Sequence, residues 1–354
     1  MPKLTTLSRE VSALRVFAVL AGSLLAASCA GDAWESLVTF DADALRPPQL
    51  EKVAETEAGV LEARFDKAAW VQTAFLAVYP DLSVREVEDG SPLVRITLAA
   101  PGRPGKQYTL ELTVRDERGN TSAYLYRFYG RNPRIPAMLI NEVIVNTPST
   151  TIYNLVEIAL LSGGDMAGVT LFLGTKSWPD SSFTFPPREV KQGEFILVHF
   201  NTAGAAGEIN ETGASKTEAS GKGASATAWD FWLPGTGNLS RDNNIISLYT
   251  DPDGSLIDAL VYSSRKYEAG ARYNGFGTSL MQNKVLEVAA EGGWTFAGAE
   301  PFPEDAFDPT GATSTRSICR DSRSTNTKSA ADWHIVPSGK RTPGAVNSDD
   351  VYSP

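Results

Sequence analysis

The sequence predicts an all-β protein with two β-sandwich domains in tandem, placed after a signal peptide and a tether. From residue 49 onward the apolar residues alternate with a period of two rather than 3.6, which is typical of strands. Turn signals separate short strands about every 8–12 residues, and no long helical pattern intervenes. The length of 354 residues corresponds to two or three domains at about 150 residues each. Hydrophobic residues at 42% and charged residues at 21% exclude general disorder and a collagen-like chain.

The charge and the rare residue types narrow the classes of function. The chain carries 32 basic and 42 acidic residues, a net charge of −10. Such a chain lacks the basic field that binding to phosphate backbones requires, so no nucleic-acid partner is expected. Two cysteines exclude a disulfide scaffold, and two histidines leave little material for a metal site.

Residues 1–28 have the features of a secretory signal peptide. Lys3, Arg9 and Arg15 precede the uncharged apolar stretch 16–27. That stretch is too short to span a membrane, which needs about 20 residues. We therefore expect export and removal of this segment.

The end of the apolar stretch, Leu25-Ala26-Ala27-Ser28-Cys29, resembles a bacterial lipobox. The resemblance implies that Cys29 receives acyl chains such as palmitate and anchors the protein in the outer or cytoplasmic membrane, facing away from the cytoplasm. Ala26 stands where an aliphatic residue is usual, as in the relaxed lipoboxes of spirochaetes. The alternative is an ordinary signal peptide cut near Ala27. Acyl chains supply about 0.8 kcal/mol per buried methylene, so several would hold the protein firmly.

Residues 29–48 are interpreted as a lipidated tether and residues 49–134 as the first sandwich. In that domain Leu110, Leu112 and Val114 share one face of a strand, and Gly119-Asn120 follow in a turn. The entry at Pro47-Pro48 and the hairpin YTLELTVRDERGNTSAYLYRFYG resemble bacterial immunoglobulin-like modules. Asp116 and Glu117 are interpreted as turn residues, with calcium binding as the alternative.

The second sandwich is predicted over residues 135–348. Its phrases occur in the order LINEV, NLVEI, GVTL, FPP, GEFILV, DGSLID and TPGAVN. Together they resemble the lamin-tail domain, which implies an immunoglobulin-like β-sandwich that tethers or recognises rather than reacts. The phrase ALLSGG at 159–164 departs from the family, where a Leu-Tyr-Asn-Pro-like phrase is usual. Independently of the resemblance, Asp253-Gly254 is a strong hairpin turn.

Two insertions extend this domain, at 202–228 and 266–312. The first has Ile209 as its one large aliphatic residue, so we expect a mobile surface loop. In the second, Ser279 and Gln282 fit a capping box and predict a short helix through residue 290.

No catalytic motif is present in the sequence: it contains neither G-x-S-x-G, H-E-x-x-H, C-x-x-C nor a P-loop. His199 and His334 are interpreted as packing or surface residues, and Cys319, in a strand-like stretch, as a small buried side chain. We therefore expect no enzyme activity, no metal site and no cofactor.

The segment containing Trp229, Phe231 and Trp232 holds three aromatic residues in four positions. In a strand, Trp229 and Phe231 face one side and Trp232 faces the other. One interpretation places these rings in the core and at the edge of the sandwich. The other makes them an exposed platform that contacts a protein or glycan ligand.

The function expected is that of a non-catalytic cell-envelope lipoprotein that presents a binding, adhesion or structural surface. The expected partners are the membrane, through the lipid on Cys29, and a protein or glycan. The alternative is an accessory subunit that tethers a separately encoded extracellular nuclease or other hydrolase.

Overall fold

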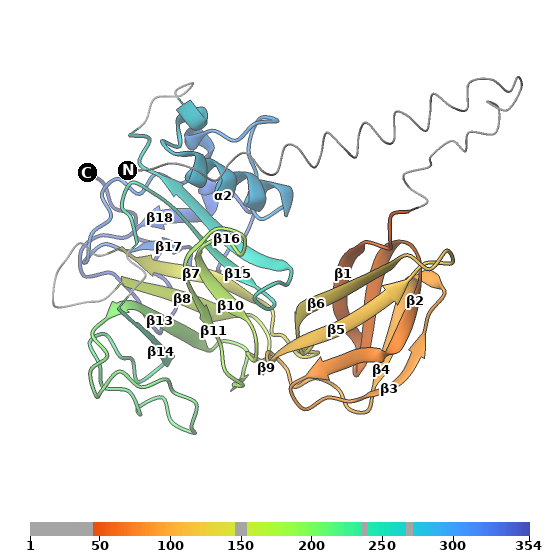
Figure 1. Ribbon diagram of the computed structural model, residues 1–354. Coiled ribbons are helices and arrows are strands. Elements are labelled where there is room, and N and C mark those ends of the chain that lie inside the picture. The colour runs from red at the N-terminus through yellow and green to blue at the C-terminus, as the bar shows by residue number, and fades with distance from the viewer. Residues whose placement is uncertain (1–44, 146–153, 236–238, 267–271) are drawn as a thin grey trace, which may run out of the picture. The chain divides into compact units, whose positions relative to one another are not determined.

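The computed structural model describes residues 45–145, 154–235, 239–266 and 272–354. Over these residues the chain is nearly all β, and its strands form the sheets of β-sandwiches (Figure 1). The prediction of an all-β fold is therefore confirmed.

The first sandwich contains six strands: β1 (Leu50–Glu57), β2 (Val60–Tyr79), β3 (Val84–Glu88), β4 (Ser91–Leu98), β5 (Gln107–Arg115) and β6 (Thr121–Tyr129). The long strand β2 joins its two layers, because the first half of β2 pairs with β1 and β4 and the second half with β5. Irregularities in register at 64–69 and 71–76 mark the transition. The core holds Leu61 and Ile96 from one layer with Leu110 and Leu112 from the other.

The second sandwich packs a six-stranded sheet on a four-stranded sheet. The larger sheet has the order β14-β13-β8-β7-β17-β18 and the smaller one β11-β10-β15-β16. The larger sheet consists of β7 (Met138–Ile144), β8 (Asn154–Leu160), β13 (Phe195–Thr202), β14 (Trp229–Pro234), β17 (Ile318–Arg320) and β18 (Trp333–Ile335). The smaller sheet consists of β10 (Thr170–Gly174), β11 (Pro179–Thr184), β15 (Asn243–Tyr249) and β16 (Leu256–Ser263). A two-stranded ladder joins β9 (Gly164–Asp165) to β12 (Glu189–Val190).

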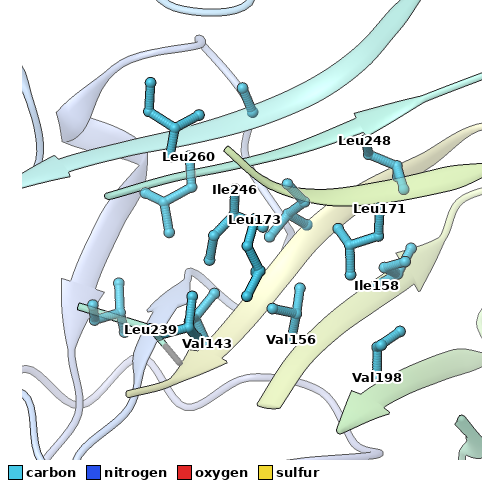
Figure 2. Close-up of a cluster of buried hydrophobic side chains, with 14 of the residues drawn as sticks. Val143, Val156, Ile158, Leu171, Leu173, Val198, Leu239, Ile246, Leu248 and Leu260 are labelled. Carbon is cyan, nitrogen blue, oxygen red and sulfur yellow. The ribbon is translucent and has the colours of Figure 1, made fainter. Parts of the chain in front are cut away.

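The core between these two sheets combines the aliphatic side chains drawn in Figure 2 with a group of aromatic rings that includes Phe185 and Phe231. Val143, Val156 and Ile158 come from the larger sheet, and Leu171 and Leu248 come from the smaller one. Alternate residues of each strand enter this core, as the period-two pattern predicts. The next residues along each strand of the larger sheet lie on its other side, here called the outer face.

The region 266–312 contains the predicted helix, α2 (Ser279–Ala290). Its N-cap is Thr278 rather than Ser279, and the Thr278 hydroxyl accepts a hydrogen bond from the Met281 N–H at 3.1 Å. Among the described residues there are also three short 3-10 segments: η3 (Arg272–Gly275), η4 (Pro303–Asp305) and η5 (Ala330–Asp332). The hairpin at Asp253-Gly254 joins β15 to β16 as expected.

Candidate functional site

The aromatic segment predicted as a ligand-contact site forms the edge strand β14. Trp229, Phe231 and Trp232 expose 7%, 0% and 3% of their surfaces. Parallel pairing with β13 places Trp229 and Phe231 between the two sheets, where Phe231 packs edge-to-face on Phe185 at 5.2 Å. The hypothesis of an exposed aromatic platform is therefore wrong, and the core and edge interpretation holds.

Trp232 lies on the outer face and stacks on His199, with ring centroids 3.8 Å apart and an interplanar angle of 10°. The His199 Nε2 atom is 2.6 Å from Asp230 Oδ1, and both side chains are buried. A Cβ on Gly221 would stand 2.6 Å from the Trp232 ring, so glycine lets the chain pass over it. The stack is thus sealed under residues of the first insertion.

The first insertion is held by the carboxylate of Glu211, which is fully buried. This carboxylate accepts hydrogen bonds from the backbone N–H groups of Glu218, Ala219 and Asp230 at 2.9–3.0 Å. The Asn210 side chain accepts another from the Trp232 N–H at 2.7 Å. The Glu211 and Asn210 side chains therefore accept hydrogen bonds from the backbone N–H groups of edge strand β14. The segment 203–228 is a loop of turns and bends, and hydrogen bonds rather than apolar burial anchor it; its mobility stays a prediction.

Four ionisable side chains form a row across the remainder of the outer face. Glu157 of β8 lies opposite Glu142 of β7. On the next strand, Cys319 of β17 lies opposite Glu142, and His334 of β18 lies opposite Cys319. The two glutamates and the cysteine have no exposed surface. Ionisable residues that alternate with core residues along a strand usually face solvent. Their burial therefore requires another segment of the chain to cover this face.

The covering segment is residues 341–350, here called the C-terminal strap. Its Gly344 N–H donates to Glu157 Oε2 at 2.6 Å, and its Thr342 N–H and hydroxyl donate to the Glu142 carboxylate at 3.2 Å. The Ser348 carbonyl lies 2.9 Å from His334 Nε2. The strap thus meets the row along its whole length.

Burial is the main cause that raises the pKa of both glutamates. The charge of Glu142 raises the pKa of Glu157 further. Burial also raises the pKa of the Cys319 thiol, and the neighbouring glutamates add to the effect. A thiol of raised pKa is a poor nucleophile, so Cys319 is the buried packing residue that the sequence predicts.

His199 is buried, and His334 contacts the strap. Within the described ranges, no three His, Cys, Asp or Glu side chains are placed to bind one metal ion. Asp116 accepts bonds from Arg118 N and Asn120 N, the pattern of a capped turn.

An exposed apolar strip on the first sandwich was missed by sequence reasoning. Phe75, Tyr79 and Leu125 expose 58%, 53% and 76% of their surfaces. Phe75 and Tyr79 belong to β2 and Leu125 belongs to β6. Glu111 of β5 lies opposite both Ala77 and Leu125, so a carboxylate stands between the two groups of exposed apolar side chains. The available clue was Leu125 itself, which occupies a solvent-side position in the alternation of β6.

Cys29 and residues 1–44 lie outside the described residues. In the part of the chain that is described, no helix has the length and apolarity to span a bilayer.

Comparison with known proteins gives three findings. A family model described as "TP_1001_2nd: protein second domain" matches residues 136–335, more than half of the chain. An "Uncharacterized protein" of Treponema pallidum (strain Nichols) is 25% identical over 248 residues, which cover 69% of this chain and 61% of that protein. The crystal structure of the S-layer protein rSbsC(31-844) aligns at 10% identity with a TM-score of 0.23, covering 59% of this chain and 40% of that chain.

Proposed function

This chain belongs to the TP_1001_2nd protein second domain family, and we propose that it is a non-catalytic lipoprotein of a bacterial cell envelope that presents a protein-binding surface. The proposed anchor is lipid on Cys29, and the proposed binding surface is the strip of Phe75, Tyr79 and Leu125.

The anchor is supported by the sequence that precedes Cys29, where a basic start, a short apolar stretch and small residues follow one another. The relaxed lipobox is of the kind found in spirochaetes, and the relative described above comes from Treponema, a spirochaete genus. Lamin-tail character is proposed from the order of the phrases LINEV, NLVEI and GEFILV in the sequence, and these phrases overlap strands β7, β8 and β13.

The single observation that carries the binding proposal is the exposed strip. The solvent side of an antiparallel sheet normally carries polar side chains, whereas here two aromatic rings and a leucine share it. Large apolar side chains gathered on one exposed face of a domain are typical of interaction sites. Leu125 is the most exposed of the three, and aromatic and aliphatic side chains are typical of the apolar core of a protein interface.

The Tyr79 hydroxyl donates to Glu111 Oε2 at 3.3 Å, which orients the Tyr79 ring beside the strip. An oriented aromatic side chain loses little conformational entropy on binding. Aromatic anchors of this type carry much of the energy of protein interfaces.

The test is cross-linking of the full-length protein in membranes of the cells that produce it. The variants are Leu125→Asp and, as a control of equal chemistry, Val351→Asp, since Val351 exposes 66% of its surface outside the strip. We expect a cross-linked protein with wild type and Val351→Asp and at least a tenfold loss with Leu125→Asp. Equal cross-linking of all three proteins would contradict the proposal.

The accessory-subunit alternative gives a different outcome in the same experiment. There the cross-linked species would be a hydrolase whose activity co-purifies with the protein. Turnover of a hydrolase substrate panel by the purified chain alone would overturn the non-catalytic proposal.

A further inference from the structure

The C-terminal strap covers two carboxyl groups that stand side by side. Glu142 and Glu157 are directly opposite each other on the antiparallel strands β7 and β8, on the same face of the sheet. Side chains in such positions have Cβ atoms about 5 Å apart, and like charges there are destabilising. Both residues are completely buried.

The hydrogen-bond partners of the two carboxyl groups differ in what they can do. Glu157 accepts hydrogen bonds from the Asn141 side-chain N–H at 2.8 Å and from the Gly344 N–H at 2.6 Å. Neither N–H group can accept a hydrogen bond from a protonated Glu157 carboxyl. Glu142 is bonded by the hydroxyls of Ser317 and Thr342 as well as by the Thr342 N–H. A hydroxyl can rotate and accept, so this pair of carboxyl groups has room for one proton.

The charged groups around Glu142 and Glu157 compensate poorly for the second negative charge that forms when both carboxyl groups are ionised. The groups that face it are Arg341 from the strap, Cys319 from β17 and His334 from β18, with Asp321 and Asp349 near Cys319. From β13 the residue opposite Glu157 is Leu197, and Asp230 and His199 lie beyond it. Arg341 is thus the cation that acts on Glu142, and its guanidinium also donates to the Ser314 carbonyl.

We propose that the C-terminal strap is a pH-sensitive latch, closed while Glu142 and Glu157 share one proton and released when both are ionised. Ionisation places two like charges side by side without water, and opening of the strap relieves this by admitting water, although the Thr342 and Gly344 N–H groups favour each carboxylate taken singly. Release uncovers Cys319, whose Sγ lies 3.9 Å from the Ser348 carbonyl. It also uncovers Ala228, against which Gly344 packs, in the small apolar cluster with Leu155 and Leu197.

The direction of the pH effect follows from the raised pKa values. Burial raises the pKa of both glutamates in the closed state. Their contribution to closure is therefore complete below the ordinary carboxyl pKa and is lost as pH rises through the raised values. If the carboxyl pKa is one pH unit higher in the closed state than in the open state, the closed-to-open ratio falls by about tenfold on full ionisation.

The experiment measures N-ethylmaleimide labelling of Cys319 in the full chain between pH 4 and pH 9, read by mass spectrometry of its peptide. Labelling is divided by that of the urea-unfolded chain at the same pH, which removes the effect of thiol ionisation. Hydrogen exchange of β15 (Asn243–Tyr249), a core strand, is followed in parallel.

We expect the labelling ratio of the wild type to rise by about tenfold or more across this pH range while β15 stays protected. Glu142→Gln and Glu157→Gln should each reduce the rise, since one buried carboxyl remains, and the double variant should make the ratio independent of pH. Glu194→Gln, a carboxylate at the start of β13 bonded to the Trp229 indole, should retain the rise. A pH-independent wild type, an undiminished rise in the double glutamine variant, or a rise that coincides with loss of protection in β15 would overturn the proposal.

Discussion

Replacing Arg320 by methionine should destabilise the second sandwich by about 3–5 kcal/mol. Arg320 is fully buried between the sheets, with one guanidinium nitrogen 3.1 Å from Asp258 and another 3.3 Å from Asp332. Its Nε also donates to the Ile140 carbonyl at 2.8 Å, and the guanidinium packs 4.4 Å from the centre of the Trp333 ring.

The magnitude follows from what the variant leaves behind. Methionine retains most of the apolar stem of Arg320, so little cavity is created. However, the buried carboxylates of Asp258 and Asp332 lose the cation that they share. Removing one partner of a buried ion pair destabilises the fold strongly, because the remaining charge is buried without compensation. For a domain of this size the loss corresponds to a fall in Tm of roughly 6–20 °C.

The loss should also depend on pH, with a sign set by Asp258. Burial raises the pKa of this carboxyl, and Arg320 opposes the rise. Without Arg320 the pKa of Asp258 rises further, so the penalty of ionising it grows as pH increases above about 4. The difference between variant and wild type should therefore be smallest at pH 3 and largest near pH 7.

The assay is differential scanning calorimetry of the full chain at both pH values. Arg134→Met serves as the control, because Arg134 makes its ion pair with Glu189 at the surface and should change Tm little. A loss of less than about 1 kcal/mol for Arg320→Met, or a difference that does not change with pH, would refute this reasoning.

Three further predictions concern the aromatic strand, the first insertion and the helix. Phe231→Ala should cost about 3–5 kcal/mol in urea unfolding, since a fully buried ring is removed; a loss below about 1 kcal/mol would contradict its place in the core. Glu211→Ala should speed proteolytic cleavage within 203–228, because three backbone donors lose their acceptor; unchanged cleavage would show that the carboxylate is not the anchor. Thr278→Ala should cost about 0.5–2 kcal/mol by removing the N-cap of α2, whereas Ser279→Ala, measured in the same way, should cost less.

The strands could be predicted from the sequence because alternation reports which residues enter a core. That pattern contains no information on strand direction, so the parallel pairing of β13 with β14 had no local cue. The helix cap was misplaced by one residue because Thr278 and Ser279 are both good capping residues.

The outer face of the six-stranded sheet was beyond sequence reasoning for a different reason. Glu142 and Glu157 occupy alternate positions that usually face water, and only the distant segment 341–350 buries them. Likewise, the first insertion has too few apolar residues to predict order, yet the buried Glu211 holds it. Burial that depends on contacts between residues far apart in sequence leaves no periodic pattern.

The central claim, that this protein is a lipid-anchored envelope protein, is tested most directly by mass spectrometry of its mature N-terminus after extraction from membranes. We predict that the first residue is Cys29 and that it carries acyl chains, and that Cys29→Ala releases the protein from the membrane. An unmodified N-terminus produced by cleavage near Ala27, with the protein in the soluble fraction, would contradict the account.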